Sequence, residues 1–252
     1  AIANGAVAVV HRKELKKHDS VYYHQVDDVM SSLHEVANNF YDNPSQKMYM
    51  YGITGTNGTS TIMKTVRNIL LRFGVNAGYI GTISVEYGDH VFEPSLTTPD
   101  IVELNSYLND MYQSGVTDVC LEVSSQGLSL RRVDGIDFDC ASFTNLSHDH
   151  LDYHKTMENY FEAKEILFNN MKDGAPFFIN IDDPYGQRLM NKHKSRSITY
   201  GVHQAADYRA KDIVLKSDST EFILVHKGIE YPVLSNFVAH FNVLNCLAVI
   251  AI

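Results

Sequence analysis

Apolar runs of strand length alternate with helical patterns along most of this chain, and this alternation is the feature that most constrains its fold. Strand-type runs lie at 48–53, 77–83, 118–123, 139–143 and 177–181. Helical apolar spacing occurs at 30–40, 59–73, 101–113, 157–171 and 184–191. Such alternation is typical of an α/β domain. We therefore predict a mainly parallel sheet flanked by helices.

The two ends of the chain depart from this alternation. Residues 208–234 read as short strands with polar breaks and predict a small antiparallel sheet. Residues 245–252 read as a helix that stops in an apolar run, which suggests that something once followed it. Near the start, the turn signal Asn43-Pro44-Ser45 separates a first segment from the rest. We expect a domain boundary there, between residues 1–47 and 48–252.

Composition excludes several classes of protein. A net charge of −9 over 252 residues argues against a general nucleic-acid or membrane-surface binder, which would need a basic face. No apolar run reaches the roughly 18–20 residues of a membrane span. The three cysteines, Cys120, Cys140 and Cys246, are widely spaced and read as buried free thiols in a reducing compartment. We expect a cytoplasmic monomer with no nucleic-acid or membrane partner.

The stretch GITGTNGTST at 52–61 follows a predicted strand and opens a predicted helix. Strand, glycine loop and helix N-terminus together form an anion site. The strict phosphate-loop pattern fails at its first glycine and at its lysine, where Thr59 stands. Ser60 still offers a hydroxyl that could ligate Mg²⁺. From this stretch alone, a nucleotide site and a plain tight turn are both open.

Polar clusters follow two other predicted strands. Glu122 ends the strand at 118–123, and TNLSHDHLDYH at 144–154 follows the strand at 139–143. In open α/β sheets the carboxyl ends of the strands face the ligand crevice. The histidine-rich run could be a polar helix cap with surface histidines. Together with the glycine loop, the two clusters favour a metal–phosphate site.

Six separated motifs then identify a family. GTNG, LEVSSQGL, TNLSHDHLDYH, YFEAKEILF, FINIDDP and HFNVLN stand in this order, supported by SLTTPD and YDNPSQ. Over nearly its whole length the chain resembles the Mur ligases, ATP-dependent enzymes that form amide bonds in bacterial cell-wall precursors. Within the family it is most similar to the branch that adds the third amino acid to UDP-N-acetylmuramoyl-L-alanyl-D-glutamate. The resemblance implies a remnant of the first domain at 1–47, a P-loop-type ATPase domain at 48–252, and no counterpart of the third domain.

The resemblance implies ATP and Mg²⁺ as cofactors and a set of metal and catalytic residues. Ser60 and Glu122 would hold one Mg²⁺, and His150 and a carbamylated Lys164 would serve a second. Carbamylation turns a cation into a carboxylate-like anion that suits a hard metal. The alternative for Lys164 is a surface lysine that pairs with the acids flanking it in YFEAKEILF.

Nucleotide and substrate contacts are also implied by the resemblance. For the nucleotide these are Gly55, Thr56, Asn57, Gly58, Thr59, Ser60, Thr61, Asn242 and Asn245. For the muramoyl substrate they are Thr97, Thr98, Ser124 and Arg132. A guanidinium suits a phosphate or carboxylate through its bidentate fork. The alternatives are a solvated loop residue for Arg132 and helix capping for Asn242.

The resemblance implies phosphoryl transfer from ATP to a substrate carboxylate, followed by attack of an amine on the acyl phosphate. Gln126, Leu96 and Ala239 differ from the residues usual at their positions, but Thr59 bears most on activity. Loss of one charge that stabilises a transition state typically costs on the order of 10²–10³-fold. We therefore expect an impaired ligase.

Two other functions remain open from the sequence. One is a nucleotide-binding module or pseudoenzyme that kept the fold and lost the chemistry, which Thr59 favours. The other is a folylpolyglutamate or cyanophycin synthetase. The LEVSSQGL and DHLDYH runs favour the peptidoglycan branch.

Overall fold

Strands and helices alternate along residues 2–252, the part of the chain described by the computed structural model. The longer helices are α1 (Val29–Phe40), α2 (Thr59–Arg72), α3 (Ile101–Gln113), α6 (Met157–Asn169), α7 (Pro184–Lys192) and α8 (Phe241–Ala251). Two short helices, α4 (Ser125–Ser129) and α5 (Leu151–His154), lie between α3 and α6. These bounds confirm the predicted helices to within a few residues.

The strands form one large sheet and one small one. In chain order the strands are β1 (Ala8–His11), β2 (Tyr22–Gln25), β3 (Tyr49–Thr54), β4 (Ala77–Ile80), β5 (Val85–Tyr87), β6 (His90–Phe92), β7 (Asp118–Glu122), β8 (Cys140–Phe143), β9 (Phe177–Asn180), β10 (Ser197–Gly201), β11 (Tyr208–Leu215), β12 (Thr220–His226) and β13 (Ile229–Ser235). The large sheet runs in the order β13-β12-β11-β10-β9-β8-β3-β7-β4-β5-β6, and β1 pairs with β2 in the small one.

The large sheet is parallel at its centre and antiparallel at both edges. Strands β4, β7, β3, β8, β9, β10 and β11 pair in parallel, as the alternating pattern predicts. The antiparallel strands expected at 208–234 are present as β11–β13, and they extend this sheet through β10. Lys227 and Gly228 both have positive φ, which suits the two-residue turn between β12 and β13. The separate small sheet is the parallel β1–β2 pair near the N-terminus.

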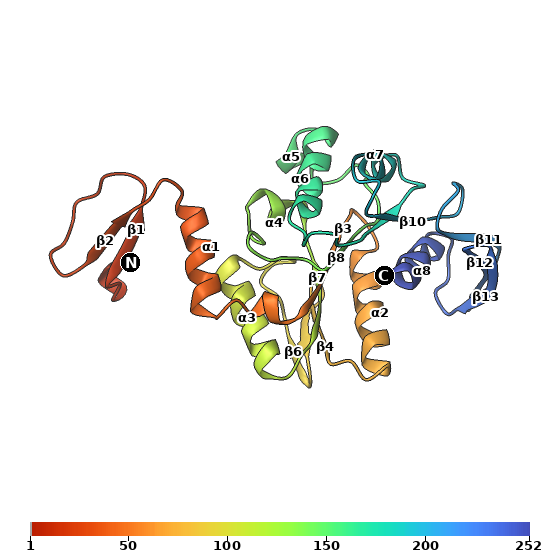
Figure 1. The fold of residues 1–252 in the computed structure, drawn as a ribbon, viewed down its shortest axis with the longest axis horizontal. Helices are drawn as coiled ribbons and strands as arrows, with labels where there is room; N and C mark the ends of the chain where they lie inside the picture. The colour runs from red at the N-terminus through yellow and green to blue at the C-terminus, as the bar shows by residue number, and fades with distance from the viewer. Residues whose placement is uncertain (1) are drawn as a thin grey trace.

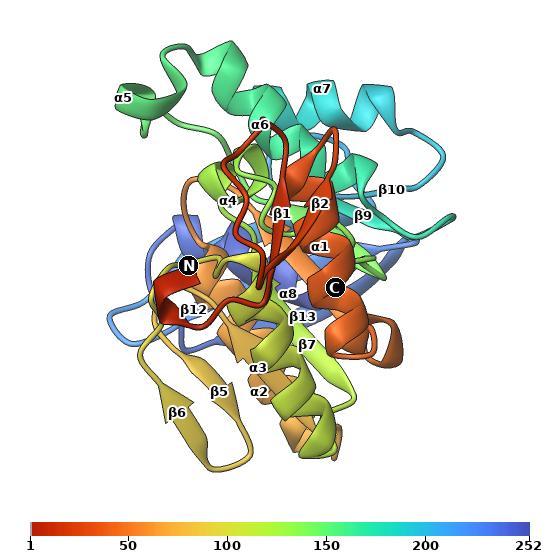
Figure 2. The same cartoon turned by 90° about the vertical axis from the view of Figure 1, so that its left-hand side faces the viewer.

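Helices cover both faces of the large sheet, because its central strands are apolar on both sides. Met50, Ala141 and Ile179 face a core completed by residues of α3, α4, α6 and α7. Ile53 and Phe178, on the other face, pack against residues of α2 and α8. Figures 1 and 2 show α2 and α8 on one side of the sheet and α3, α4 and α6 on the other. All three cysteines are buried and free, as expected.

The first segment lies at the side of this body. Figure 1 shows β1 and β2 standing apart from the sheet, with α1 between them and α3. Ala37 of α1 is buried in the core that α3 also lines, and Asn105 Nδ2 donates a hydrogen bond to Asn38 Oδ1 at 2.9 Å. Within residues 2–252, the helices lack the length and apolar character needed to cross a bilayer.

Strand β3 lies at the point where the sheet order changes direction. Its neighbours β7 and β8 both come later in the chain, and they flank it on opposite sides. The loops that leave the carboxyl ends of β3, β7 and β8 therefore meet at one place. In an open α/β sheet this is where a ligand crevice forms.

Candidate functional site

The glycine loop between β3 and α2 is shaped by two close approaches of the backbone to other elements. Gly58 has φ +89°, and a Cβ there would lie 2.4 Å from Asn245 Oδ1. A Cβ on Gly55 would lie 1.8 Å from Thr144 Oγ1. Gly58 is required both for its positive φ and for the close approach of Asn245. Gly55 is required only because a Cβ would clash with Thr144. The loop is thus packed between the end of β8 and helix α8.

The segment after β8, Thr144-Asn145, holds the same loop in place by hydrogen bonds. Asn57 N donates to Asn145 Oδ1 at 3.0 Å, and Asn145 Nδ2 donates back to the Asn57 carbonyl at 3.0 Å. Thr144 Oγ1 donates to that carbonyl at 2.9 Å. Thr56 N donates to the Asn145 carbonyl at 2.9 Å. The conformation of the glycine loop is therefore held before any ligand arrives, which reduces the ordering cost of binding.

Glu122 lies at the end of β7, buried beside the start of α2. Its side chain is 2% exposed, and within residues 2–252 its hydrogen-bond donors are all neutral. Thr59 Oγ1 and Ser60 Oγ each donate to Glu122 Oε2 at 2.9 Å. The Tyr79 hydroxyl donates to Oε1, and Thr82 contacts both oxygens. The proximity of Ser60 to Glu122 that the resemblance implied is present.

Lys164 is buried in α6 with its ammonium against the glycine loop. Its side chain is 2% exposed, which excludes the surface ion-pair alternative. The Nζ atom donates a hydrogen bond to the Gly55 carbonyl at 2.7 Å and lies 4.8 Å from the centre of the Tyr160 ring. Burial lowers the pKa of Lys164 to about 7, although the nearby Asp149 raises it. At neutral pH a large share of this side chain is an unprotonated amine.

His150 lies on the same side of the loop but is more accessible. It occupies a left-handed backbone position, with φ +50°, just before α5. Its side chain is half exposed, and Nε2 lies 3.6 Å from Asp149 Oδ2. The last histidine of the run is different, since His154 is buried and its Nε2 lies 2.9 Å from Ser125 Oγ. Of the three histidines in the run, His148 and His150 are therefore exposed, and His154 is buried and structural.

A cavity of about 200 Å³ collects most of the predicted metal and substrate residues. Its predicted lining residues are Gly55, Thr56, Thr59, Thr97, Glu122, Ser124, Arg132, His150 and Lys164. They come from separate segments of the chain that meet at the carboxyl ends of β3, β7 and β8. Within the described residues, no three His, Cys, Asp or Glu side chains gather as a metal cluster, so a cation here would need other oxygen ligands.

A second cavity, of about 480 Å³, lies on the other side of the glycine loop. Its lining includes the predicted residues Asn57, Gly58, Thr61 and Asn245. It also includes Thr144, Asn145, Asn180, Tyr200, Phe241 and Leu244, which sequence reasoning did not assign. A mixture of amide and apolar groups beside a phosphate-type loop suits a nucleotide base and sugar.

Thr98 and Asn242 have their polar groups engaged within the protein. The Thr98 hydroxyl is buried and donates to the Glu122 carbonyl at 2.9 Å, and the Ser124 backbone N–H donates to Thr98 Oγ1 at 2.9 Å. Asn242 Nδ2 donates to the Val238 carbonyl at 2.6 Å. Asn242 Oδ1 accepts from Asn245 Nδ2 at 2.8 Å. Thr98 thus holds the backbone of Glu122 and Ser124 in place, and Asn242 orients the side chain of Asn245.

Arg132 stands between the smaller cavity and a broader groove. Its Nη1 donates to the Thr98 carbonyl at 3.1 Å, so it is not simply a solvated loop residue. It also lines an open groove of about 870 Å³ between α1 and α3. An arginine in this position could contact an anionic ligand that extends from one space into the other.

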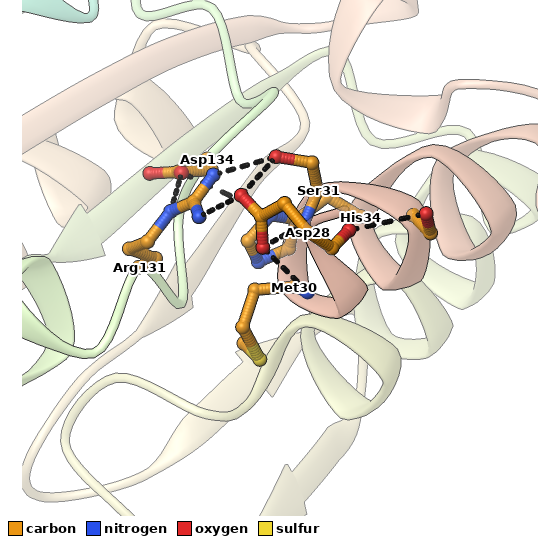
Figure 3. A network of polar contacts seen from close by, with 7 residues as sticks. Asp28, Met30, Ser31, His34, Arg131 and Asp134 are labelled. Carbon is orange, nitrogen blue, oxygen red and sulfur yellow. Dashed lines mark hydrogen bonds and ion pairs between the residues drawn. The ribbon is translucent and has the colours of Figure 1, made fainter. Parts of the chain in front are cut away.

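The neighbouring Arg131 ties the first segment to this part of the molecule (Figure 3). Its Nη1 donates to Asp28 Oδ2 at 2.7 Å, and its Nε donates to Asp134 Oδ2 at 2.6 Å. Asp28 also caps α1 by accepting from the Met30 and Ser31 backbone N–H groups. The guanidinium of Arg131 is the main reason that the pKa of Asp28 lies well below its usual range. Helix α1 is therefore anchored directly beside Arg132.

Sequence reasoning missed several residues that shape the site. Thr82 follows the carboxyl end of β4, so its position near a crevice could have been inferred. Asn145 lies in the TNLSH run that was recognised but not assigned a role. Tyr79, inside an apolar strand, carries no local signal of its contact with Glu122.

Comparison with known proteins agrees with this geometry. Residues 53–252 match the family described as the Mur ligase middle domain. The chain is 41% identical to UDP-N-acetylmuramoyl-L-alanyl-D-glutamate--2,6-diaminopimelate ligase 1 of Clostridium acetobutylicum, over 100% of this chain and 52% of the relative. It is 37% identical to the corresponding ligase of Caldanaerobacter subterraneus, again over 100% of this chain and 52% of that protein.

Solved structures give the same result. The structure of a UDP-N-acetylmuramoyl-L-alanyl-D-glutamate--2,6-diaminopimelate ligase is similar with a TM-score of 0.85 at 30% identity, covering 98% of this chain and 51% of that one. The fold is also shared with a MurF ligase from Thermotoga maritima in complex with ADP, with a TM-score of 0.67 at 19% identity over 99% of this chain and 54% of that one.

The chain spans about half the length of the curated relatives that it matches. The family match nevertheless covers most of its residues, including the glycine loop, Glu122, His150 and Lys164. The chain therefore belongs to the Mur ligase family and contains that family's middle domain.

Proposed function

We propose that this chain is the central part of an ATP-dependent ligase that joins an amino acid to UDP-N-acetylmuramoyl-L-alanyl-D-glutamate in cytoplasmic peptidoglycan synthesis. The names of its relatives give 2,6-diaminopimelate as the amino acid, and we propose the same acceptor here. We assign residues 1–47 to a preceding substrate-binding domain and residues 48–252 to the ATPase domain. The amino acid would bind to a third domain beyond this sequence.

One observation carries the proposal: the smaller cavity combines a phosphate-type loop with an arginine, a buried lysine and a buried carboxylate. Lys164, Arg132 and Glu122 line it together with Thr97 and Ser124. Arg132, Thr97 and Ser124 would bind the anionic muramoyl dipeptide. The larger cavity across the loop would hold the adenosine, so that the terminal phosphate reaches the dipeptide around Gly55–Gly58.

The reaction that this arrangement supports has two steps. A carboxylate oxygen of the dipeptide attacks the γ-phosphorus of ATP, and the bond from that phosphorus to the ADP oxygen breaks. The amine of the amino acid then attacks the acyl-phosphate carbon, inorganic phosphate leaves, and a proton is released. The contribution of the chain to the first step is positioning by backbone N–H groups and Arg132.

The residues present fit Mg²⁺. This ion is commonly held by one or two carboxylates plus substrate phosphates, and it does not need a cluster of protein ligands. The Glu122 carboxylate and the Ser60 hydroxyl, 2.9 Å apart, supply hard oxygen atoms beside the loop. His150 and Lys164 would serve a second ion across the same cavity. Bound Mg²⁺ would neutralise charge on the phosphates during transfer.

Lys164 is suited to carbamylation by its burial. The neutral amine attacks CO₂, forms a nitrogen–carbon bond and releases one proton. A pKa lowered to about 7 supplies the neutral amine at physiological pH. The product is an anion facing the cavity, where the unmodified side chain would bring a positive charge to the metal site. We propose that this carbamate is the form that serves the second Mg²⁺.

The proposal is tested by ligation in the longest natural polypeptide that contains this sequence. ATP, Mg²⁺, the UDP-muramoyl dipeptide and diaminopimelate are supplied, and the amide product is detected by mass spectrometry. We expect slow product formation, and Thr59→Lys should raise substrate-dependent phosphate release by at least about 10²-fold. Product formation at roughly 1 s⁻¹ or faster by the Thr59 protein would show that another cation replaces the loop lysine. No product from either protein would exclude the ligase function.

A second candidate is a nucleotide-binding module without ligase activity. The observation that favours it is the position of Thr59. Its hydroxyl donates a hydrogen bond to Glu122 and supplies no positive charge to a phosphate. Tight nucleotide binding together with no product, even from the Thr59→Lys protein, would support this alternative.

A further inference from the structure

We infer that the Thr59 hydroxyl competes with a divalent cation for Glu122, so that Thr59 weakens metal binding in addition to removing a positive charge. This inference rests on the proposed Mg²⁺ site at Glu122 and Ser60. It concerns one atom, Glu122 Oε2, and the donors that surround it. The competition would be a property of this chain, since it follows from the residue that replaces the loop lysine.

The two oxygens of Glu122 have different surroundings. Oε1 faces the sheet, where it accepts from the Tyr79 hydroxyl and from the Thr82 backbone N–H at 3.2 Å. A Cβ on Gly81 would lie 2.2 Å from Oε1, so the backbone is also close on this side. These contacts fix the orientation of the carboxylate. Oε2 is left as the oxygen that faces the start of α2 and could ligate a cation.

Oε2 is already fully engaged. It accepts from Thr59 Oγ1 at 2.9 Å, Ser60 Oγ at 2.9 Å and Thr82 Oγ1 at 3.2 Å. A carboxylate oxygen has about two lone-pair directions, so three donors leave none for a cation. Binding of a metal to Oε2 therefore requires that donors leave it.

The three hydroxyl donors differ in whether another interaction can replace the hydrogen bond to Glu122 Oε2 when a cation binds there. Ser60 can keep donating its proton to Glu122 while a lone pair of its own oxygen binds the same cation. Thr82 Oγ1 has a second partner, Thr97 Oγ1 at 3.1 Å, and can turn to it. For Thr59 Oγ1, the bond to Glu122 is the one side-chain hydrogen bond found within residues 2–252. Displacing the Thr59 hydroxyl from Glu122 Oε2 is thus the most costly of the three changes, because among the described residues no other side-chain hydrogen bond replaces the lost one.

The buried setting strengthens this competition. Glu122 is 2% exposed, so water is poorly placed to replace a lost donor. Hydrogen bonds to a charged acceptor are stronger than those between neutral groups. A cation must overcome that bond in this chain. With a residue that lacks a hydroxyl at position 59, and with Thr82 Oγ1 turned to Thr97 Oγ1, one direction of Oε2 would be open to the cation.

The test is a titration of the nucleotide-free chain with Mn²⁺, followed through the electron paramagnetic resonance signal of free Mn²⁺. Thr59→Val keeps the branched shape and removes the hydroxyl, and it should tighten Mn²⁺ binding on the order of tenfold, as expected for one hydrogen bond to a charged group. Thr59→Ser restores a hydroxyl and should bind as weakly as the natural chain. Thr59→Ala provides a second variant without a hydroxyl if Thr59→Val does not fold.

Thr65→Val is the matched control. Thr65 lies on the same helix and its Oγ1 donates to the Thr61 carbonyl at 2.7 Å, away from Glu122. This variant should leave the affinity for Mn²⁺ unchanged. Equal affinities for the natural chain, Thr59→Val and Thr59→Ala would overturn the inference.

A double variant separates this inference from the function on which it rests. Glu122→Gln in the Thr59→Val background should abolish the gain in Mn²⁺ affinity. If Glu122→Gln weakens binding in the natural chain while Thr59→Val changes nothing, the proposed metal site stands and the competition does not. If Glu122→Gln has no effect in either background, the metal is not on Glu122, and both the site and the inference are wrong.

Discussion

The Lys164 ammonium donates a hydrogen bond to the Gly55 carbonyl at 2.7 Å, although 109 residues separate them in the chain. This contact brings a side chain of α6 against the glycine loop that follows β3. Because the loop is also clasped by Asn145 and approached by Asn245, three distant segments determine its shape. The site therefore depends on tertiary packing at the loop as much as on the loop residues.

The first prediction concerns the pH dependence of stability at Lys164. Its pKa is lowered from 10.5 to about 7 in the folded chain, so between these values the unfolded chain binds the extra proton. Stability should rise with pH through this window, while the cost of burying the charge is fully present below it. In bicarbonate-free buffer, Lys164→Met should be more stable than the natural chain at about pH 6, by on the order of several kcal/mol. This difference should shrink towards pH 10.

Urea unfolding at several pH values measures this difference. Lys194→Met, at an exposed lysine, controls for the general loss of one positive charge. A stability difference for Lys164→Met that stays constant across the window would contradict the lowered pKa.

The second prediction is that Gly58→Ala weakens nucleotide binding by about tenfold or more. A Cβ at Gly58 would lie 2.4 Å from Asn245 Oδ1, and its φ of +89° strains any other residue. Asn245 would have to move away from the larger cavity. Isothermal titration with ATP analogues measures the affinity.

Gly74→Ala separates strain from contact in that experiment. Gly74 has a similar φ of +80°, but a Cβ there meets nothing within 4 Å. Both variants should lose stability, and only Gly58→Ala should lose affinity. Equal loss of affinity in the two variants would mean that the contact with Asn245 is unimportant.

The third prediction is that Tyr79→Phe destabilises the fold by roughly 1.5–3 kcal/mol, the range for a hydrogen bond to a charged group. Tyr79 is fully buried and its hydroxyl donates to Glu122. Burial raises the pKa of Tyr79, so the hydroxyl keeps its proton at neutral pH. Tyr51→Phe should cost less, because Asp118, which accepts from Tyr51, is partly exposed to water. Urea unfolding of both variants tests the order.

The fourth prediction concerns the anchor of α1 at Asp28 (Figure 3). Asp28→Ala removes both the helix cap and the ion pair with Arg131, whereas Asp28→Asn keeps an oxygen for the cap. The midpoint of thermal unfolding should fall more for Asp28→Ala than for Asp28→Asn. Differential scanning calorimetry gives the midpoints, and an equal fall in both would assign the whole effect to the ion pair.

The charge of Asp28 also predicts the response to acid. Because Arg131 holds the pKa of Asp28 well below its usual value of 3.8, the carboxylate contributes stability above that value. This contribution is lost as pH falls through the lowered pKa. The difference between the natural chain and Asp28→Asn should therefore be present at neutral pH and vanish in strong acid. A difference that persists in strong acid would show another cause.

Much of the fold could be predicted from local patterns. The spacing of apolar residues determined the order of strands and helices, since each periodicity reflects which side of an element is buried. The helix at 101–113 was predicted with the bounds of α3. Strands β2, β5, β6 and β10 were missed. Strands β5 and β6 are only three residues long, and β2 and β10 are short and contain polar residues. The motif order by itself also identified the family.

Only the tertiary structure decided the chemical state of the site. The sequence placed Lys164 between acids on a helix, but packing buried it and lowered its pKa. It placed Thr59 where a lysine is usual, but only the fold brought that hydroxyl to Glu122, 63 residues away. The physical reason is that periodicity encodes which faces of an element are buried. Whether a particular charged group is buried, and which groups it hydrogen-bonds, depends on the tertiary fold. The crossover connections determine which loops meet at one edge of the sheet.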